Sequence, residues 1–128
     1  MFSPIKTEYY DMNEYSVVIR MDYKNSSFLF TGDAEIYNET EMMNKGYDLD
    51  VDILKVGHHG SSTSSSQKFL NAVSPKIAVI QVGKNNDYGH PHKEIKTRLK
   101  NIETYRTDTN GNIVIETNGK EYKVTTQK

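Results

Sequence analysis

Short runs of β-branched and aromatic residues alternate along this chain with segments whose apolar residues recur at helical spacing. Residues 15–21 and 27–31 are two such runs, and the turn-forming residues 22–26 between them predict a β-hairpin. Residues 51–56 alternate apolar and polar positions, whereas residues 76–82 are almost continuously apolar, which is typical of a strand covered on both faces. Both segments are therefore predicted to be central strands of a sheet.

Three segments, residues 34–44, 67–73 and 93–100, are predicted to be helices. The first ends at Lys45-Gly46, a common helix terminus. The second follows serine hydroxyls that can cap a helix, and the third has Pro91 near its start. In the first helix, the apolar residues Ile36, Tyr37, Met42 and Met43 recur loosely at helical spacing.

The end of the chain predicts three more strands, at residues 102–106, 113–116 and 122–125. They are separated by Asn110-Gly111 and Asn118-Gly119, and both dipeptides favour tight hairpins. Strands and helices alternate through the middle of the chain, so the predicted fold class is α/β or α+β with a mixed sheet. Residues 1–12 have no clear period and are interpreted as an incoming segment that precedes a domain at residues 13–128.

The composition limits the kinds of binding and catalysis that this chain can support. The 128 residues are enough for one domain, and nine Tyr and four Phe are too many for a typical disordered segment. A net charge of -1 provides no general basic field, so a nucleic acid would have to be held by a specific site. There is no cysteine, so disulfides, thiolate metal sites and cysteine nucleophiles are excluded. Metal chemistry would therefore use histidine and carboxylate ligands.

Two candidate metal-ligating sites follow predicted strands. Asp33 comes after a hydrophobic strand and Gly32, and it is either a metal ligand or the cap of the helix that begins near residue 34. His58 and His59 lie between two glycines directly after another strand, and neutral imidazole is the commonest metal ligand in proteins. In an extended strand the two rings would point in opposite directions, so only one would bind a given metal directly unless the loop twists. The alternative is a polar surface loop.

Two further segments could contact a substrate. Residues 61–66 offer hydroxyls and free backbone amides at a helix start, which could bind a phosphate or could form only a capped loop. After the buried strand, His90 could donate to a phosphate or act as a general acid beside Tyr88, whereas His92 is assigned a structural role in the first helical turn. The alternating Asp48, Asp50 and Asp52 are interpreted as solvated carboxylates.

Taken in order, these motifs resemble the metallo-β-lactamase superfamily, and within it the competence-type (ComEC-like) hydrolase domain of DNA-uptake proteins. The resemblance runs from about Asn13 to Val124. It rests on Asn13-x-x-Ser16-Val17-Val18-Ile19, on residues 28–35 (Phe-Leu-Phe-Thr-Gly-Asp-Ala-Glu), on residues 54–61 (Leu-Lys-Val-Gly-His-His-Gly-Ser), and on residues 88–92 (Tyr-Gly-His-Pro-His).

The resemblance implies two metal ions, Zn²⁺ or Mn²⁺, at one edge of an αββα sandwich. Of that sandwich the chain would form the C-terminal half, a mixed sheet with helices on one face. The metal ligands implied are Asp33, which would bridge the ions, and one histidine of the pair. His58 is preferred to His59 for this role. The catalytic residue implied is His90, which would face the scissile phosphate. Ser61, Ser62 and Tyr88 are expected to line the substrate pocket.

One departure changes these expectations. The superfamily motif His-x-His-x-Asp-His is absent, and the four histidines of the chain cannot supply it. The chain is therefore expected to begin partway through the fold, to bind metal weakly and to lack turnover on its own. Its expected partners are an anionic substrate such as DNA, the missing N-terminal half, or a second copy that covers an exposed apolar sheet face.

The function implied is the C-terminal portion of a metal-dependent hydrolase that acts on phosphodiesters in DNA uptake. A DNA-uptake role would place the chain on the extracellular face of a membrane; otherwise it is secreted or cytoplasmic. Two alternatives remain: a non-catalytic binding module that retains the fold, and an unrelated α/β domain with incidental histidines.

Overall fold

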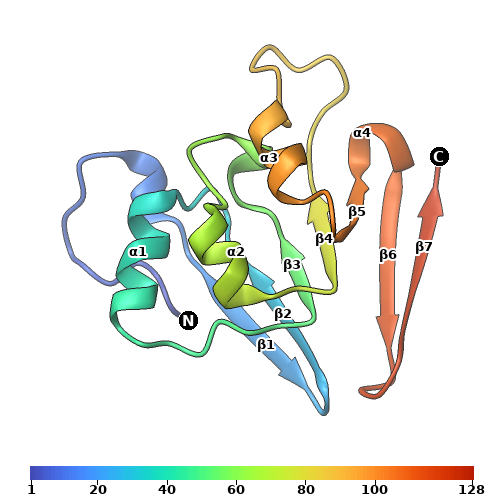
Figure 1. Cartoon of the computed structure of the whole chain (residues 1–128), viewed down its shortest axis with the longest axis horizontal. Coiled ribbons are helices and arrows are strands. Elements are labelled where there is room, and N and C mark those ends of the chain that lie inside the picture. The colour runs from blue at the N-terminus through green and yellow to red at the C-terminus, as the bar shows by residue number, and fades with distance from the viewer.

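The computed structural model describes all 128 residues and contains a five-stranded mixed sheet, a separate hairpin and several short helices (Figure 1). The strands are β1 (Ile19–Tyr23), β2 (Ser26–Phe30), β3 (Ile53–Lys55), β4 (Ile77–Ile80), β5 (Glu103–Arg106), β6 (Asn112–Thr117) and β7 (Tyr122–Gln127). The α-helices are α1 (Ile36–Asn44), α2 (Gln67–Val73), α3 (Lys93–Arg98) and α4 (Thr107–Asn110), and the 3₁₀ turns are η1 (Met12–Tyr15) and η2 (Gly57–Gly60). The mixed α/β class is the one predicted.

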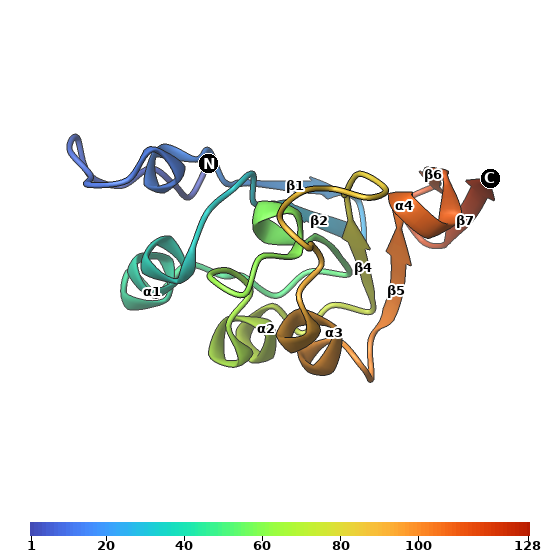
Figure 2. The ribbon, with the colours of Figure 1, turned by 90° about the horizontal axis from the view of Figure 1, so that it is seen from above.

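The strand order in the main sheet is β1-β2-β3-β4-β5. The β1–β2 pair is antiparallel, as the predicted hairpin requires, and the remaining neighbours are parallel. Strand β3 is the central strand and β4 is its neighbour, so both lie inside the sheet, as predicted. Helix α2 carries the chain from the end of β3 back to the start of β4, so the two strands run parallel. Helices α1, α2 and α3 all lie on one side of this sheet (Figure 2).

Alternation along the strands divides the apolar side chains between the two faces of the sheet. Leu29, Leu54 and Ala78 are register partners on β2, β3 and β4, and they belong to the main core under the helices. Their neighbours Phe28, Ile53 and Ile77 form a second cluster on the opposite face. The main core is thus built between the sheet and its single layer of helices.

The second face is only partly covered. Ile115, Tyr122 and Val124 of the β6–β7 hairpin pack against the second cluster, and the hairpin stands beside β5 (Figure 1). An apolar groove of about 810 Å³ lies between the hairpin and β1–β2. Around it, Val17, Ile19, Met21, Tyr23 and Phe30 are 43% to 48% exposed. We call this surface the open face.

Helix α1 buries only part of the apolar residues that recur at helical spacing: Met42 is buried and Met43 packs against the main core. Ile36 and Tyr37 are exposed, whereas the buried residues are Asn38, Glu39 and Met42. Asn38 Nδ2 donates to the backbone oxygen of Glu14 at 2.7 Å, and the Glu39 carboxylate accepts backbone N–H groups from the serine loop. Buried polar side chains with partners thus form part of the buried side of α1, and spacing alone does not reveal such partners.

The two Asn-Gly dipeptides also have different outcomes. Asn118-Gly119 connects β6 to β7 as a hairpin, as predicted. Asn110-Gly111 does not form a hairpin, because β5 and β6 belong to different sheets. It instead ends α4, where the Asn110 side chain accepts the N–H of Arg106 at 2.8 Å. None of the helices combines the length and the hydrophobicity that a membrane span requires.

The first residues of the chain are attached to the fold. Ser3 and Val18 form an isolated antiparallel bridge beside β1, and the N–H of Phe2 donates to the oxygen of Val18 at 2.7 Å. Phe2 and Ile5 also pack against the main core. The incoming segment therefore extends the edge of the sheet.

Candidate functional site

The candidate residues gather where β2, β3 and β4 end. These three strands are parallel, so their carboxyl ends meet at one edge of the sheet, which is where α/β folds commonly bind ligands. Asp33 follows β2, His58 and His59 form the turn η2 after β3, and His90 lies in the loop after β4. The fold thus brings together residues that are up to 57 positions apart.

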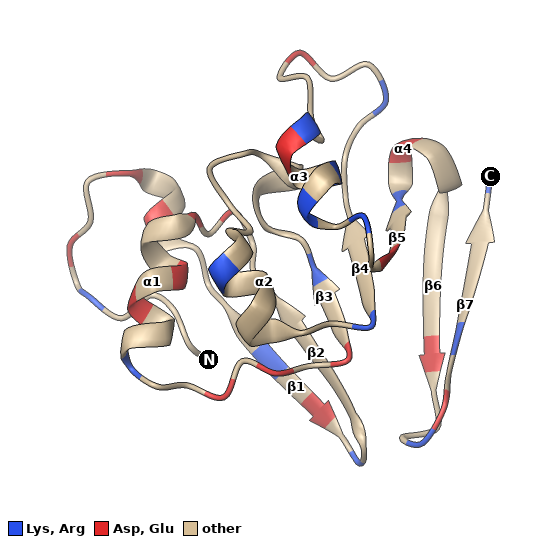
Figure 3. Cartoon of the chain, viewed as in Figure 1, with Lys and Arg blue, Asp and Glu red and all other residues tan.

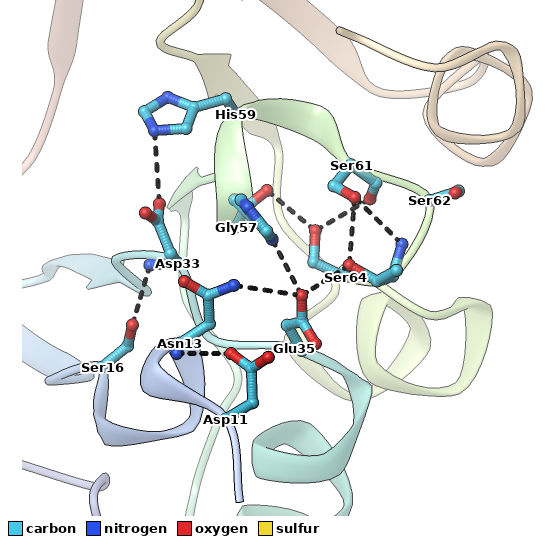
Figure 4. Close-up of polar contacts among 12 residues, drawn as sticks. Asp11, Asn13, Ser16, Asp33, Glu35, Gly57, His59, Ser61, Ser62 and Ser64 are labelled. Carbon is cyan, nitrogen blue, oxygen red and sulfur yellow. Dashed lines mark hydrogen bonds and ion pairs between the residues drawn. The ribbon is translucent and has the colours of Figure 1, made fainter. Parts of the chain in front are cut away.

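Asp33 and His59 point toward each other in this site (Figure 4). Asp33 Oδ1 lies 3.4 Å from His59 Nε2. The other ring nitrogen of His59, Nδ1, lies 2.7 Å from the backbone oxygen of Gln81, which can only accept, so Nδ1 carries a proton. A neutral His59 would then turn the Nε2 lone pair toward a carboxylate oxygen, which is unfavourable unless a proton or a cation lies between them.

This pair fits a divalent metal in chemistry and in spacing. Two donors bound to one tetrahedral ion at about 2.1 Å lie about 3.4 Å apart, which is the separation of Asp33 Oδ1 and His59 Nε2. Carboxylate and imidazole are common ligands of Zn²⁺ and Mn²⁺. The pair is nevertheless only part of a site, because no group of three or more such side chains in the chain is placed to hold a metal ion.

The backbone around Asp33 is held by two polar contacts. Its N–H donates to Ser16 Oγ at 3.1 Å, and Lys55 Nζ donates to the preceding carbonyl, that of Gly32, at 2.8 Å. Asp33 does not cap α1, whose N-terminal flanking residue is Glu35. Burial lowers the pKa of Lys55, and the nearby Asp33 carboxylate opposes that change. Asp33 is therefore presented by a fixed turn, and its side chain is free of a capping role.

His58 has a separate set of partners. Both histidines adopt left-handed backbone angles, with φ of 45° at His58 and 54° at His59, so the loop twists and the pair is not extended. His58 Nδ1 lies 3.0 Å from Glu35 Oε1, and the same oxygen accepts from Thr63 Oγ1 at 2.8 Å and from Asn13 Nδ2 at 3.5 Å. His58 is thus bound to Glu35, and it is His59 that lies against Asp33.

His90 lies beside the histidine pair. Its ring centroid is 5.8 Å from that of His58, and Tyr88, which is 78% exposed, stacks on it at 5.6 Å. The Asn86 side chain makes two hydrogen bonds to the His90 backbone: it accepts from the N–H and donates to the oxygen. Burial and the neighbouring His92 and His58 lower the pKa of His90, so the neutral ring is favoured and its use as a proton acceptor is easier than its use as an acid.

His92 has the structural position that was expected. Its Nδ1 accepts from the N–H of Ser62 at 2.9 Å, and its Nε2 donates to the oxygen of Tyr88 at 3.1 Å. Because both ring nitrogens are used within the protein, His92 ties the serine loop to the loop of His90. Tautomer and ring orientation are fixed by these two bonds.

The amides of the serine loop are not free, contrary to expectation. Glu39 accepts the N–H groups of Ser65 and Ser66, the latter at 3.0 Å, and His92 accepts that of Ser62. Burial raises the pKa of Glu39, although its hydrogen bonds favour the charged form. Ser61 is only 5% exposed and its hydroxyl is paired with Thr63. A carboxylate of the protein itself therefore occupies the position expected for a bound anion.

Sequence reasoning missed two residues that support the site. Glu35 was visible in the motif of residues 28–35, but nothing local indicates that its carboxylate collects three donors from separate segments. Gln81 contributes only a backbone oxygen, to which residue type gives no clue. The one available signal was that Asn13 and Ser16 belong to the same motif. In the structure the Asn13 side chain donates to Glu35, and the Ser16 hydroxyl accepts from the N–H of Asp33.

Comparisons with known proteins identify the family of this chain. A family model described as the metallo-beta-lactamase superfamily matches residues 2–84, and the chain belongs to this superfamily. It is a competence-type member: it is 40% identical over 115 residues to ComE operon protein 3 of Bacillus subtilis, covering 88% of this chain and 15% of that protein. It is also 40% identical over 111 residues to competence protein ComA of Neisseria gonorrhoeae, covering 84% and 16% respectively.

A third relative is recombination protein 2 of Haemophilus influenzae, which is 41% identical over 90 residues, 68% of this chain and 11% of that protein. The chain thus spans between 11% and 16% of the length of these three relatives.

Proposed function

We propose that this chain forms part of the catalytic domain of a competence-type, metal-dependent hydrolase that cleaves phosphodiester bonds in DNA. The observation that carries the proposal is the Asp33–His59 pair, whose donor atoms face each other at 3.4 Å at the carboxyl ends of parallel strands. The names of the similar competence proteins support a role connected with DNA. Hydrolysis and the choice of DNA are inferences from this chemistry and this likeness.

Each side chain of the site has a role in this proposal. Asp33 and His59 hold a divalent cation, Zn²⁺ or Mn²⁺, together with ligands that this chain does not supply. Such a cation stabilises the charge that develops on a phosphate during hydrolysis. His58 completes the inner wall of the site, and His90, beside the exposed ring of Tyr88, faces the scissile group. Ser62 lies at the rim, next to His92.

DNA would be held locally. Lysine and arginine are interspersed with aspartate and glutamate over the fold, as Figure 3 shows, and the net charge is -1. Binding through neutralised phosphates is therefore expected to involve few contacts in this chain and to depend weakly on salt.

We further propose that the open face is covered by the remaining half of an αββα sandwich. Its groove is lined by 14 residues, ten of them hydrophobic, and large exposed apolar patches mark association surfaces. When the chain is alone, a second copy is expected to cover the same face. Light scattering should then give a mass above that of one chain, and Phe30→Lys should lower it.

Val114→Lys is the matched control for that measurement, because Val114 is 42% exposed but does not line the groove. A monomeric wild-type chain, or equal effects of the two lysine variants, would contradict self-association through the open face.

Metal binding tests the core of the proposal. The chain, purified without a histidine tag, should bind Zn²⁺ or Mn²⁺ in a calorimetric titration, and Asp33→Asn and His59→Ala should each weaken binding at least about tenfold. Asp48→Asn, at an exposed carboxylate outside the site, should leave it unchanged. Unaltered affinity in Asp33→Asn would refute the metal role.

Because the proposal makes this chain part of a larger catalytic domain, activity is measured on that whole domain. Its hydrolysis of a phosphodiester such as bis(p-nitrophenyl) phosphate and of linear DNA should require added metal and should fall in His59→Ala. Metal binding without any phosphodiester cleavage would instead favour a non-catalytic binding module, the alternative function.

A further inference from the structure

We infer that Glu35 is a positioning residue: its carboxylate holds the proton of His58 on Nδ1 and so leaves the lone pair of His58 on Nε2, the ring nitrogen that faces away from Glu35. The inference goes deeper into the proposed function, since it concerns the same site. It stands on three hydrogen bonds that meet at one oxygen of Glu35, and its test requires no metal.

The donors at Glu35 Oε1 come from three segments of the chain. They are Thr63 Oγ1 at 2.8 Å, His58 Nδ1 at 3.0 Å and Asn13 Nδ2 at 3.5 Å. An ionised carboxylate can only accept hydrogen bonds, so the His58 nitrogen in this bond must be the protonated one. In a neutral imidazole the other nitrogen, Nε2, then carries the lone pair.

The backbone leaves this ring little freedom to choose another arrangement. The N–H of His58 donates to the oxygen of Gly32 at 3.1 Å, and its oxygen accepts from the N–H of Ser61 at 2.8 Å. The side chains of His58 and Glu35 are each only 23% exposed. Because the main chain is tied on both sides, the direction of the ring depends on its one hydrogen bond, which is to Glu35.

His59 also has its Nδ1 hydrogen-bonded to a protein oxygen, but the partner is different. Its Nδ1 donates to the backbone oxygen of Gln81 at 2.7 Å, and its Nε2 faces Asp33. Both neighbouring histidines thus keep a proton on Nδ1 by means of a protein oxygen, one from a side chain and one from the main chain. A side chain can be removed by mutation, so only the His58 half of the arrangement depends on a residue type.

This difference defines the experiment. In the chain labelled with ¹⁵N at histidine, the nitrogen shifts and the two-bond couplings to ring protons report the tautomer of each ring. At mildly alkaline pH, where histidines are neutral, both His58 and His59 should show the Nδ1–H pattern. In Glu35→Ala, His58 should lose that pattern, whereas His59 should keep it and so act as an internal control for folding.

Two further variants separate positioning from general disturbance. Glu35→Gln should restore the Nδ1–H pattern, because its amide oxygen can still accept from His58 and Thr63. Glu41→Ala removes a glutamate within α1 that contacts Tyr9 and Lys6 instead, and should change neither histidine. The inference is overturned if His58 of the wild type carries its proton on Nε2, or if its pattern is the same in Glu35→Ala.

A separate readout concerns the consequence for the site. Groups that orient metal-binding or catalytic histidines commonly change metal affinity or rate by about 10–100-fold when removed. In the whole catalytic domain of the proposed function, Glu35→Ala should lower the rate of phosphodiester hydrolysis by such a factor, with Glu35→Gln between it and wild type. If no hydrolysis is found at all, the proposed function fails, while the tautomer of His58 still decides the role of Glu35.

Discussion

Gly60 sets how closely the histidine turn approaches the loop of His90, and replacing it with alanine should be costly. Gly60 has φ of +82°, and a Cβ there would lie 2.6 Å from Pro91 Cβ and 3.1 Å from Pro91 Cα. Its oxygen also accepts from the N–H of His92 at 3.0 Å. The added methyl would therefore push apart two loops that are tied together on both sides of the contact.

The cost has two parts. A left-handed backbone costs an alanine about 1–2 kcal/mol, and forcing a methyl into a packed contact costs about 1–3 kcal/mol more. The matched control is Gly46→Ala, because Gly46 has φ of +70° but nothing within 4 Å of an added Cβ. It should show the backbone cost alone, and any gain from a stiffer unfolded chain is common to both variants.

Urea denaturation followed by far-ultraviolet circular dichroism measures this difference, since the chain has no tryptophan. Gly60→Ala should lose about 1–3 kcal/mol more unfolding free energy than Gly46→Ala, with similar denaturant slopes. Equal losses in the two variants would refute the close packing of Gly60 on Pro91. Loss of all folded signal in Gly60→Ala alone agrees with the larger cost.

Three further predictions concern stability and use the same urea assay. Leu54→Ala, at a fully buried position of β3, should cost about 2–5 kcal/mol, and a loss below about 1 kcal/mol would contradict its place in the core. Burial opposes ionisation of Asp52, but bonds from Lys76 and Ser27 prevail and lower its pKa. Its stabilisation is therefore present above about pH 4 and lost as the pH falls through its folded-state pKa, so the deficit of Asp52→Asn should vanish in acid. Glu39 has a raised pKa, so wild type should lose stability relative to Glu39→Gln as the pH rises through that value, and parallel pH profiles would refute this.

Asp52 also illustrates a limit of pattern reasoning. It was interpreted as one of three solvated carboxylates, and its side chain is instead only 15% exposed and accepts from Ser27 and Lys76. The sequence contains all three groups, but Ser27 lies on β2, Asp52 directly precedes β3 and Lys76 directly precedes β4. Only the pairing of these strands places a hydroxyl, an ammonium and a carboxylate together.

The local patterns determined most of the elements of this protein. The β1–β2 hairpin, helix α2 with its Ser66 cap, and strands β3 and β4 were predictable because periodicity, turn formers and caps act over a few residues. The motifs also located the edge of the sheet at which Asp33 and the histidines meet, since each follows a strand. Residue types and their order were sufficient for both.

Tertiary structure decided what these residues contact. It placed His59, and not His58, against Asp33, and it placed His58 against Glu35. It also paired the backbone N–H groups of Ser65 and Ser66 with the Glu39 carboxylate. It also left the second face of the sheet open between β1–β2 and the β6–β7 hairpin. Local spacing cannot specify these pairings, because each joins segments brought together only when the sheet and its layer of helices are packed.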